Sequence, residues 1–340
     1  MDFLPATARL PRIILGLLLF AIGITGLQCT GDRSSSNQLD VAFEETLRLG
    51  TDQPDAPSHR LFSDPAHVAV GDDGTLFVVD RGAPTIRVYD ETGTYQRSIG
   101  EEGNGPGEFR RITALHAHDG RLLVADQRQA RITALSPTGT VQNTHQLSDV
   151  PRIAQIAEYT DDQYLVVGSG RGHLVHVVDS SFSTVRASLV AESDVRTTDH
   201  KLETVAVQFM PGRVAARSPD EVVYAPALYP GELYEYTRTD TAWTQTDVYE
   251  GHGAHDPPAT FSPLEQTERV DLPISLQQGR YGVQFHSISW GLTAGSDGTI
   301  THVFSRESGD VLQLTLERFR ADGTPLGSTV VDTASPPMAL

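Results

Sequence analysis

The chain has 340 residues, enough for one large domain or two ordinary ones, and 39% of them are hydrophobic, as in globular proteins. Its 44 acidic residues outnumber 26 basic ones, giving a net charge of −18 at pH 7. Proteins that bind nucleic acid carry a basic footprint, so this charge excludes nucleic acid as a general partner.

An uncharged apolar run, "IILGLLLFAIGITGL", occupies residues 13–27 and follows Arg9 and Arg12. It has the length of the hydrophobic region of an export signal and is short for a membrane span. We therefore expect the protein to leave the cytoplasm, with residues 1–29 forming the signal.

The only cysteine, Cys29, lies two residues beyond this run and precedes the polar stretch "TGDRSSSNQ". The arrangement resembles a bacterial lipoprotein signal, which implies that Cys29 is the lipid attachment site. The protein would then reside in the cell envelope (periplasm or outer membrane), touching the membrane only through this N-terminal anchor, with residues 30–39 as a flexible tether. Cleavage nearby, giving a secreted protein, and retention as an uncleaved anchor are the alternatives.

Residues 40–335 are predicted to form a single domain, and its sequence repeats itself. "DGTLFVVDRGAPTIRVYDETGTY" (73–95) aligns with "DGRLLVADQRQARITALSPTGTV" (119–141) at one offset of 46, without a gap. Weaker copies follow at 162–179, 220–240 and 297–327. Such a period is typical of a repeat architecture.

Each repeat predicts four short antiparallel strands. In the first copy "HVAV" and "TLFVVD" are apolar strands joined by "DDG", and Asp-Gly favours a tight hairpin turn. "TIRVYD" alternates, as a half-buried strand does, and "TYQRSIG" is a polar fourth strand. Four such strands make one blade of a β-propeller, so the predicted fold class is all-β.

A glycine-rich stretch, "GEEGNGPGEF" at residues 100–109, lies between the fourth strand of the first repeat and the first strand of the second. It lacks the lysine and the helix of a phosphate-binding loop, and its glutamates would repel phosphate. We interpret it as a connector between blades.

The stretch "DPAHVAVGDDGTLFVVDRGAPTIRVYDETGTYQRSIGEEGNGPGEF" resembles the NHL-type repeat. It is similar in particular to six-bladed propeller lipoproteins of Bacteroidota-like bacteria, which carry this G-x-G-P-G-E-[FY] connector. The resemblance covers residues 64–141 best, is weaker to 190 and over 286–330, and is poor between 245 and 285. It implies a fold rather than an activity.

Six blades are predicted, with five or seven as alternatives. The longest interval between turns, before residue 298, holds either a degenerate sixth blade around "RYGVQFHSISW" or an insertion. The segment "VAFEETLRLG" (41–50) is predicted to be an outer strand that closes the ring by pairing with the last blade.

The predicted ligand site lies on the face that carries the loops between second and third strands together with the connectors. Arginines are enriched there, and such a rim could attract an anionic small molecule, such as a carboxylate, sulfate or acidic saccharide. The alternative is that each arginine pairs with a local acid (Asp80, Asp126 or Glu307) or is solvated. The candidates are Arg81, Arg110, Arg111, Arg128, Arg131, Arg171 and Arg306.

Metal sites and catalytic groups are less well supported. Asp80 and Asp126 end equivalent strands, where a turn-capping role is favoured over a ring of metal ligands. His252, His255 and Asp256 in "GHGAHDPP" have a spacing that a metal tolerates, but they lie in a predicted loop. No G-x-S-x-G motif is present. Tyr229, Tyr234 and Tyr236 fit strand packing better than a sugar-binding platform.

Two classes of function remain. The first, which the sequence favours, is a non-enzymatic exported module that binds an anionic ligand or a protein partner and needs no cofactor. The second is a metal-dependent enzyme of the lyase or lactone hydrolase type, as in other six-bladed propellers. It would need His, Asp, Asn or Glu ligands converging from several blades, and the histidines fall at different repeat positions.

Overall fold

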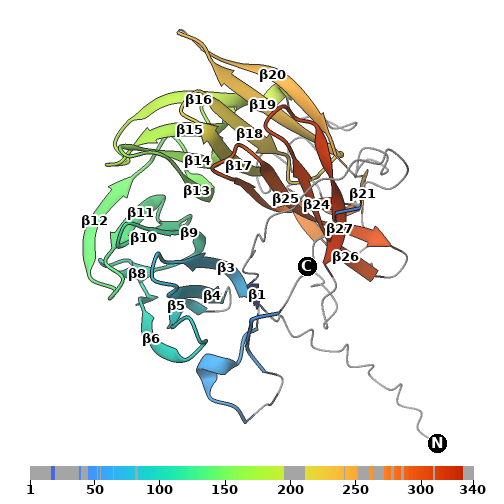
Figure 1. Ribbon diagram of the computed structural model, residues 1–340. Coiled ribbons are helices and arrows are strands. Elements are labelled where there is room, and N and C mark those ends of the chain that lie inside the picture. Colours follow the sequence, from blue (N-terminus) through green and yellow to red (C-terminus); the bar gives the residue numbers. More distant parts are fainter. Residues whose placement is uncertain are drawn as a thin grey trace, which may run out of the picture.

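The computed structural model is an all-β propeller of four-stranded antiparallel blades (Figure 1). It describes residues 17–19, 38–39, 45–51, 53, 55–63, 65–80, 83–194, 211–240, 242–251, 260–263, 272–276, 279–284, 287–308 and 311–331. Within these ranges no helix is long and apolar enough to cross a membrane.

Five four-stranded blades are present among the described residues, each with its strands in chain order. Blade 1 is β3 (Pro65–Val70), β4 (Leu76–Asp80), β5 (Ala83–Tyr89) and β6 (Tyr95–Ile99). Blade 2 is β9 (Ile112–His118), β10 (Arg121–Asp126), β11 (Arg131–Leu135) and β12 (Val141–Gln146). Blade 3 is β13 (Arg152–Thr160), β14 (Gln163–Gly170), β15 (His173–Asp179) and β16 (Val185–Ala191). Blade 4 is β17 (Arg213–Ser218), β18 (Glu221–Ala225), β19 (Glu232–Arg238) and β20 (Trp243–Glu250). Blade 5 is β24 (Ser287–Ala294), β25 (Ile300–Ser308), β26 (Val311–Phe319) and β27 (Pro325–Val331).

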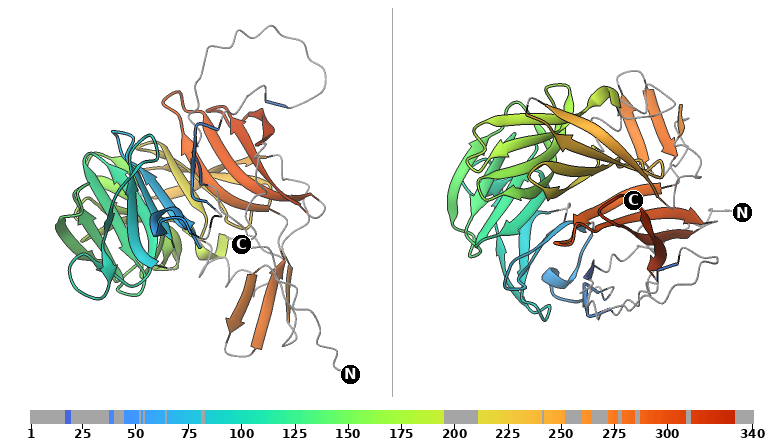
Figure 2. Two further views of the ribbon diagram at one scale, coloured as in Figure 1. Left: turned by 90° about the horizontal axis from the view of Figure 1, so that it is seen from below. Right: turned by 45° about the horizontal axis from the view of Figure 1, so that its top comes forward.

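The long interval before the last blade holds a separate sheet. Strands β21 (Thr260–Pro263), β22 (Leu272–Leu276) and β23 (Gly279–Gln284) pair in the order β21–β23–β22, and Figure 2 shows them beside the blades rather than among them. The stretch "RYGVQFHSISW" is divided, since residues 280–284 belong to β23 and residues 287–290 begin blade 5. The described residues therefore give five four-stranded blades, one of the counts that the sequence allowed.

The blades are held together by apolar side chains between neighbouring sheets. Ile86 and Val88 of blade 1 and Leu122 and Val124 of blade 2 are buried in one cluster with Phe109 of the connector. The second strand of each of these two blades is buried almost throughout, as expected for a strand with sheets packed on both sides. The first strands are the innermost ones, and neighbours such as β17 and β24 lie against each other.

The N-terminal segment contacts both the last and the first blade. Leu39 N donates to Ser328 O of β27 at 2.9 Å, and Gln38 forms a parallel bridge with the same residue. This contact with the last blade precedes the predicted segment 41–50, within which Leu49 packs with blade 1 instead. Strand β2 (Leu47–Leu49) pairs antiparallel with β1 (Leu17–Leu19) from the apolar run.

Two short strands and two 3-10 turns complete the described elements. Strands β7 (Glu101–Glu102) and β8 (Glu108–Phe109) pair in parallel inside the glycine-rich connector. The 3-10 turns η1 (Ser58–Arg60) and η2 (Glu192–Asp194) lie before blade 1 and after blade 3.

Candidate functional site

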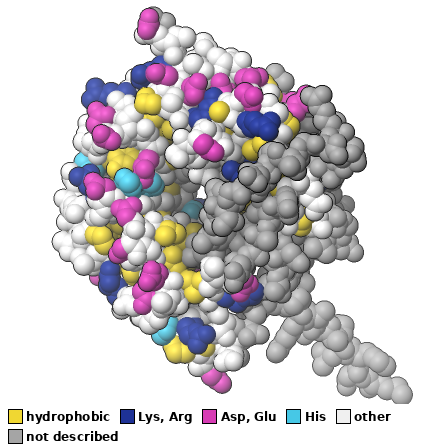
Figure 3. Space-filling view, in the orientation of Figure 1, with side chains coloured by type: hydrophobic (Ala, Val, Ile, Leu, Met, Phe, Trp, Pro, Cys, Tyr) yellow, Lys and Arg dark blue, Asp and Glu magenta, His cyan; other side chains and the backbone are white. Residues whose placement is uncertain are grey.

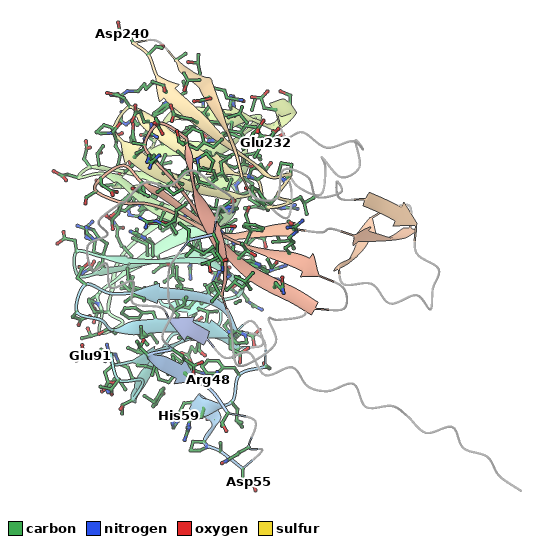
Figure 4. The ribbon with its side chains drawn as sticks, turned by 45° about the vertical axis from the view of Figure 1, so that its right-hand side comes forward. Arg48, Asp55, His59, Glu91, Glu232 and Asp240 are labelled. Atoms are coloured by element: carbon green, nitrogen blue, oxygen red, sulfur yellow. The ribbon has the colours of Figure 1, made fainter. Side chains whose placement is uncertain are left out.

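The propeller has two faces with different chemistry. The loop face carries the loops between second and third strands and the inter-blade connectors. The turn face carries the turns between first and second and between third and fourth strands. Figure 4 shows Glu91 and Asp240, both in turns between third and fourth strands, on the side away from Glu232, which begins β19 beside a second-to-third-strand loop.

On the loop face the buried carboxylate of Asp126 accepts hydrogen bonds from the main chain of three arginines of the predicted anion site. Its oxygens accept hydrogen bonds from the N–H groups of Arg110 (2.6 Å), Arg111 (3.2 Å) and Arg128 (3.0 Å). They also accept from the main-chain N–H and the side-chain amide of Gln129 at 3.2 and 2.8 Å. The predicted turn-capping role of Asp126 is confirmed, since it joins the loop after β10 to the connector before β9.

Asp80 has the same capping role in blade 1. Its carboxylate, 3% exposed, accepts from the main-chain N–H of Ser63 at 2.8 Å and from its hydroxyl at 3.0 Å. Arg87 lies 3.7 Å away. Both aspartates are therefore occupied by donors from the chain, which is what the capping interpretation predicted.

The connector is a packed element and contains no free anion-binding loop. Arg131 donates to the main-chain oxygens of Asn104 (3.2 Å), Gly105 (2.8 Å) and Glu108 (2.6 Å). Its guanidinium thus holds the connector in place. Among the arginines predicted to bind an anion, Arg131 therefore has a structural role. Gly100 has φ of +80° and lies against Phe109, which is fully buried.

The other arginines of this region differ in how they are engaged. Arg110 bonds Asn104 Oδ1 at 3.1 Å and lies 3.8 Å from Glu102. Arg111 and Arg128 are exposed, and among the described residues their guanidinium groups have no hydrogen-bond or ion-pair partner. Of the three arginines bonded to Asp126 through their main chain, these two therefore have exposed side chains without a partner among the described residues.

The remaining candidates lie apart from this cluster. Arg171 follows β14 with φ of +53° and forms an exposed ion pair with Asp149 at 3.5 Å. Arg306 is half-buried on β25, opposite Ser287. Arg81, Cys29, His252, His255 and Asp256 lie outside the described residues.

Elsewhere the described residues offer no metal centre: nowhere do three or more His, Cys, Asp or Glu side chains converge in a way that suits an ion. On the turn face, His118 Nδ1 lies 2.9 Å from Glu158 and 3.4 Å from Asp72. A cavity of about 190 Å³ adjoins this group and is lined by Asp72, His118 and Arg121 among others. The cavity lies on the face opposite to Arg111 and Arg128.

Two polar groups inside the fold were not anticipated from the sequence, one of them buried and the other half-buried. Glu317 accepts from Tyr229 and lies 2.8 Å from His302 Nδ1, while His302 Nε2 lies 3.0 Å from Ser289 Oγ. All four side chains are at most 4% exposed, so this acid–histidine–serine chain is closed to a substrate. Tyr234, like Tyr229, is buried, which confirms packing rather than a sugar platform.

The second unanticipated group is Arg213, the first residue of β17. Its Nε donates to Trp290 O of β24 at 2.9 Å, and its Nη1 donates to Gly212 O at 2.9 Å. Burial lowers the pKa of the guanidinium from its ordinary value. Nothing in the local sequence "PGR" signals this position, because the partner strand is 77 residues away.

The acidic side chains form no single patch on the visible surface. Figure 3 shows them spread among arginines and apolar side chains over the blades. Local geometry, rather than net charge, therefore decides where an anion is attracted.

Comparison with known proteins places this architecture in a family. A family model described as a 6-bladed beta-propeller (DUF5128) matches residues 55–245, more than half of the chain. The chain belongs to this family. No curated protein matches the sequence.

Solved structures give similar propellers at low identity. A protein described as exported, from Bacteroides fragilis, is 11% identical with a TM-score of 0.48, covering 83% of this chain and 74% of that one. A Bacteroides caccae protein is 10% identical with a TM-score of 0.45, covering 80% and 84%. A streptogramin B lyase is 14% identical with a TM-score of 0.43, covering 77% and 65%. The family match, and not these structures, carries the assignment.

Proposed function

We propose that this protein is an exported, non-enzymatic binding module that takes a small anionic ligand on its loop face. The observation that carries the proposal is the Asp126 turn, which presents Arg111 and Arg128, both exposed and without an acidic partner among the described residues. The two side chains leave the same turn, and exposed guanidinium groups held in this way can bind a ligand carboxylate or sulfate through charge-assisted hydrogen bonds.

Export and anchoring are part of the proposal. The apolar run at 13–27 has the length of a signal, and Cys29 lies where a lipoprotein carries its lipid. The repeats resemble the NHL type found in envelope lipoproteins of Bacteroidota-like bacteria. The ligand would then meet the loop face outside the cytoplasm.

Thermal unfolding of the full chain tests the binding site. At one fixed ionic strength, uronates, citrate and sulfate are compared with uncharged sugars, because a ligand that binds only the folded state raises the melting temperature. We expect an anion-dependent increase that is lost in the double variant Arg111→Ala/Arg128→Ala. Arg186→Ala, an exposed arginine paired with Asp179 at 3.3 Å on the turn face, is the matched control.

The same measurement separates the enzyme alternative. A melting temperature that falls in EDTA and is restored by one divalent metal would contradict the proposal in favour of a metal-dependent enzyme. An equal response in the double variant would move the anion site elsewhere. The absence of a shift with every anion would refute a small anionic ligand.

A further inference from the structure

Arg213 is a half-buried arginine whose guanidinium keeps N–H donors that no described residue accepts. A guanidinium carries five N–H donors, and Arg213 uses two, to the main-chain oxygens of Trp290 and Gly212. Among the described residues no carboxylate pairs with it. Partial burial weakens the hydration of this cation and no described counter-ion compensates for the loss, so the position calls for an explanation.

Arg217, on the same strand, shows what this chain does with a buried arginine elsewhere. Its guanidinium pairs with Glu235 at 2.8 Å and with Glu221 at 3.2 Å, and also donates to the hydroxyl of Tyr249 at 2.8 Å. With 44 acidic residues against 26 basic ones, counter-ions are plentiful. The lack of one at Arg213 is therefore specific to its position.

The surroundings fix Arg213 in place before any ligand arrives. Gly212 has φ of +96°, and a Cβ there would collide with Ala225 O. Strand β17 is further tied to blade 3, because the side-chain amide of Gln155 exchanges two hydrogen bonds with the main chain of Val214, at 3.0 and 3.1 Å. A donor group held in this way loses little entropy when it binds.

The position of Arg213 is on the loop face, near the axis. It begins the innermost strand of blade 4, where the chain enters from a connector, as Arg111 directly precedes the innermost strand of blade 2. Arg152 begins the innermost strand of blade 3. Three consecutive blades thus place an arginine at the same end of their inner strands.

We propose that Arg213 is the primary anion-binding residue of this protein, and that its three remaining N–H groups bind the carboxylate of a small ligand near the axis. The inference rests on the proposed function and deepens it. A planar carboxylate accepts two parallel N–H bonds from a guanidinium, which a lysine ammonium cannot supply. Arg111 and Arg128 then attract the ligand from the rim.

Titration of the full chain with galacturonate tests this, with galactose as the uncharged control and sulfate as the inorganic oxyanion. Binding is measured by calorimetry. We expect Arg213→Gln to weaken galacturonate binding by about 10- to 100-fold, the range for losing a charge-assisted hydrogen bond. Arg213→Lys should recover only part of it, and Arg186→Gln should bind as the unaltered chain does.

The outcomes separate the two proposals. If Arg111→Ala/Arg128→Ala abolishes binding while Arg213→Gln, shown to be folded by circular dichroism, binds normally, the inference about Arg213 is wrong and the proposed function stands. If Arg213→Lys binds as well as the unaltered chain, the two-bond geometry is refuted. Equal binding of galactose and galacturonate, or binding of neither anion, would overturn both proposals.

Discussion

Replacing Asp126 by alanine is the sharpest test of how the loop face is built. The carboxylate accepts four main-chain N–H groups, from Arg110, Arg111, Arg128 and Gln129, and one side-chain amide. It is 1% exposed. The substitution removes the acceptor and leaves these donors facing an apolar methyl group.

The size of the effect follows from that list. A hydrogen bond to a charged group contributes about 1.5–3 kcal/mol, and an unpaired buried donor costs a similar amount. The arginine side chains around the turn are exposed, so water will satisfy part of the loss. We therefore expect Asp126→Ala to lower the free energy of unfolding by about 3–5 kcal/mol. With an unfolding entropy of about 2.1 cal/mol/K per residue over roughly 300 folded residues, the melting temperature should fall by about 5–8 °C.

Urea denaturation and an anion titration measure the two consequences together. Asp80→Ala is the matched control, because Asp80 ends the equivalent strand of blade 1 and accepts from Ser63 near Arg87, whereas the main chain of Arg111 and Arg128 is bonded to Asp126. Both variants should lose stability. Only Asp126→Ala should also weaken anion binding, because only Asp126 fixes the main chain of Arg111 and Arg128. A loss of less than about 0.5 kcal/mol, the range of an ordinary surface substitution, would refute the reasoning.

Two further predictions concern stability. Gly100→Ala should destabilise the protein by about 2–4 kcal/mol, because the new Cβ would lie 2.5 Å from the ring of Phe109, whereas Gly120→Ala, with nothing within 4 Å of the new Cβ, should cost only about 1 kcal/mol. Equal losses in thermal unfolding would contradict this. Burial lowers the pKa of both His116 and His176 to about 4, with His118 contributing at His116. An unfolded histidine titrates near 6.5, so the unfolded state takes up protons first as the pH falls. The free energy of unfolding should therefore fall from pH 7 towards pH 4, by about 2 kcal/mol per histidine at pH 5. Urea midpoints that do not change between pH 7 and pH 5 would exclude this contribution of the two histidines to the pH dependence of stability.

The sequence predicts the fold well where structure is local. Asp73 and Gly74 form the first turn as expected, with Thr75 N donating to Asp73 Oδ1 at 3.0 Å and Gly74 at φ of +81°. The same residues recur at Asp119 and Gly120 at the predicted offset. Turn chemistry and strand periodicity act within a few residues, so a single sequence contains them in full.

The site was predictable only in outline, because the direction of a long side chain depends on distant main chain. Arg128 lies in the loop that leads to Arg131, the first residue of β11, yet Arg131 turns to the oxygens of the connector while Arg128 faces solvent. Arg213 acquires its partner from Trp290 in the next blade. The sequence identified a face rich in arginine. Which of these arginines bond to the main chain and which remain exposed became clear only from the contacts between blades and connectors.

The placement of carboxylates explains how an acidic protein can still offer cationic groups. On the turn face, Asp73, Asp297 and Asp322 each accept the main-chain N–H two residues ahead, and these bonds lower the pKa of each carboxyl group. On the loop face Asp80 and Asp126 are buried caps. In both places the carboxylates accept hydrogen bonds from main-chain N–H groups, as in Asx turns and caps. What the Asp126 turn leaves exposed is arginine, so its local potential can oppose the sign of the net charge.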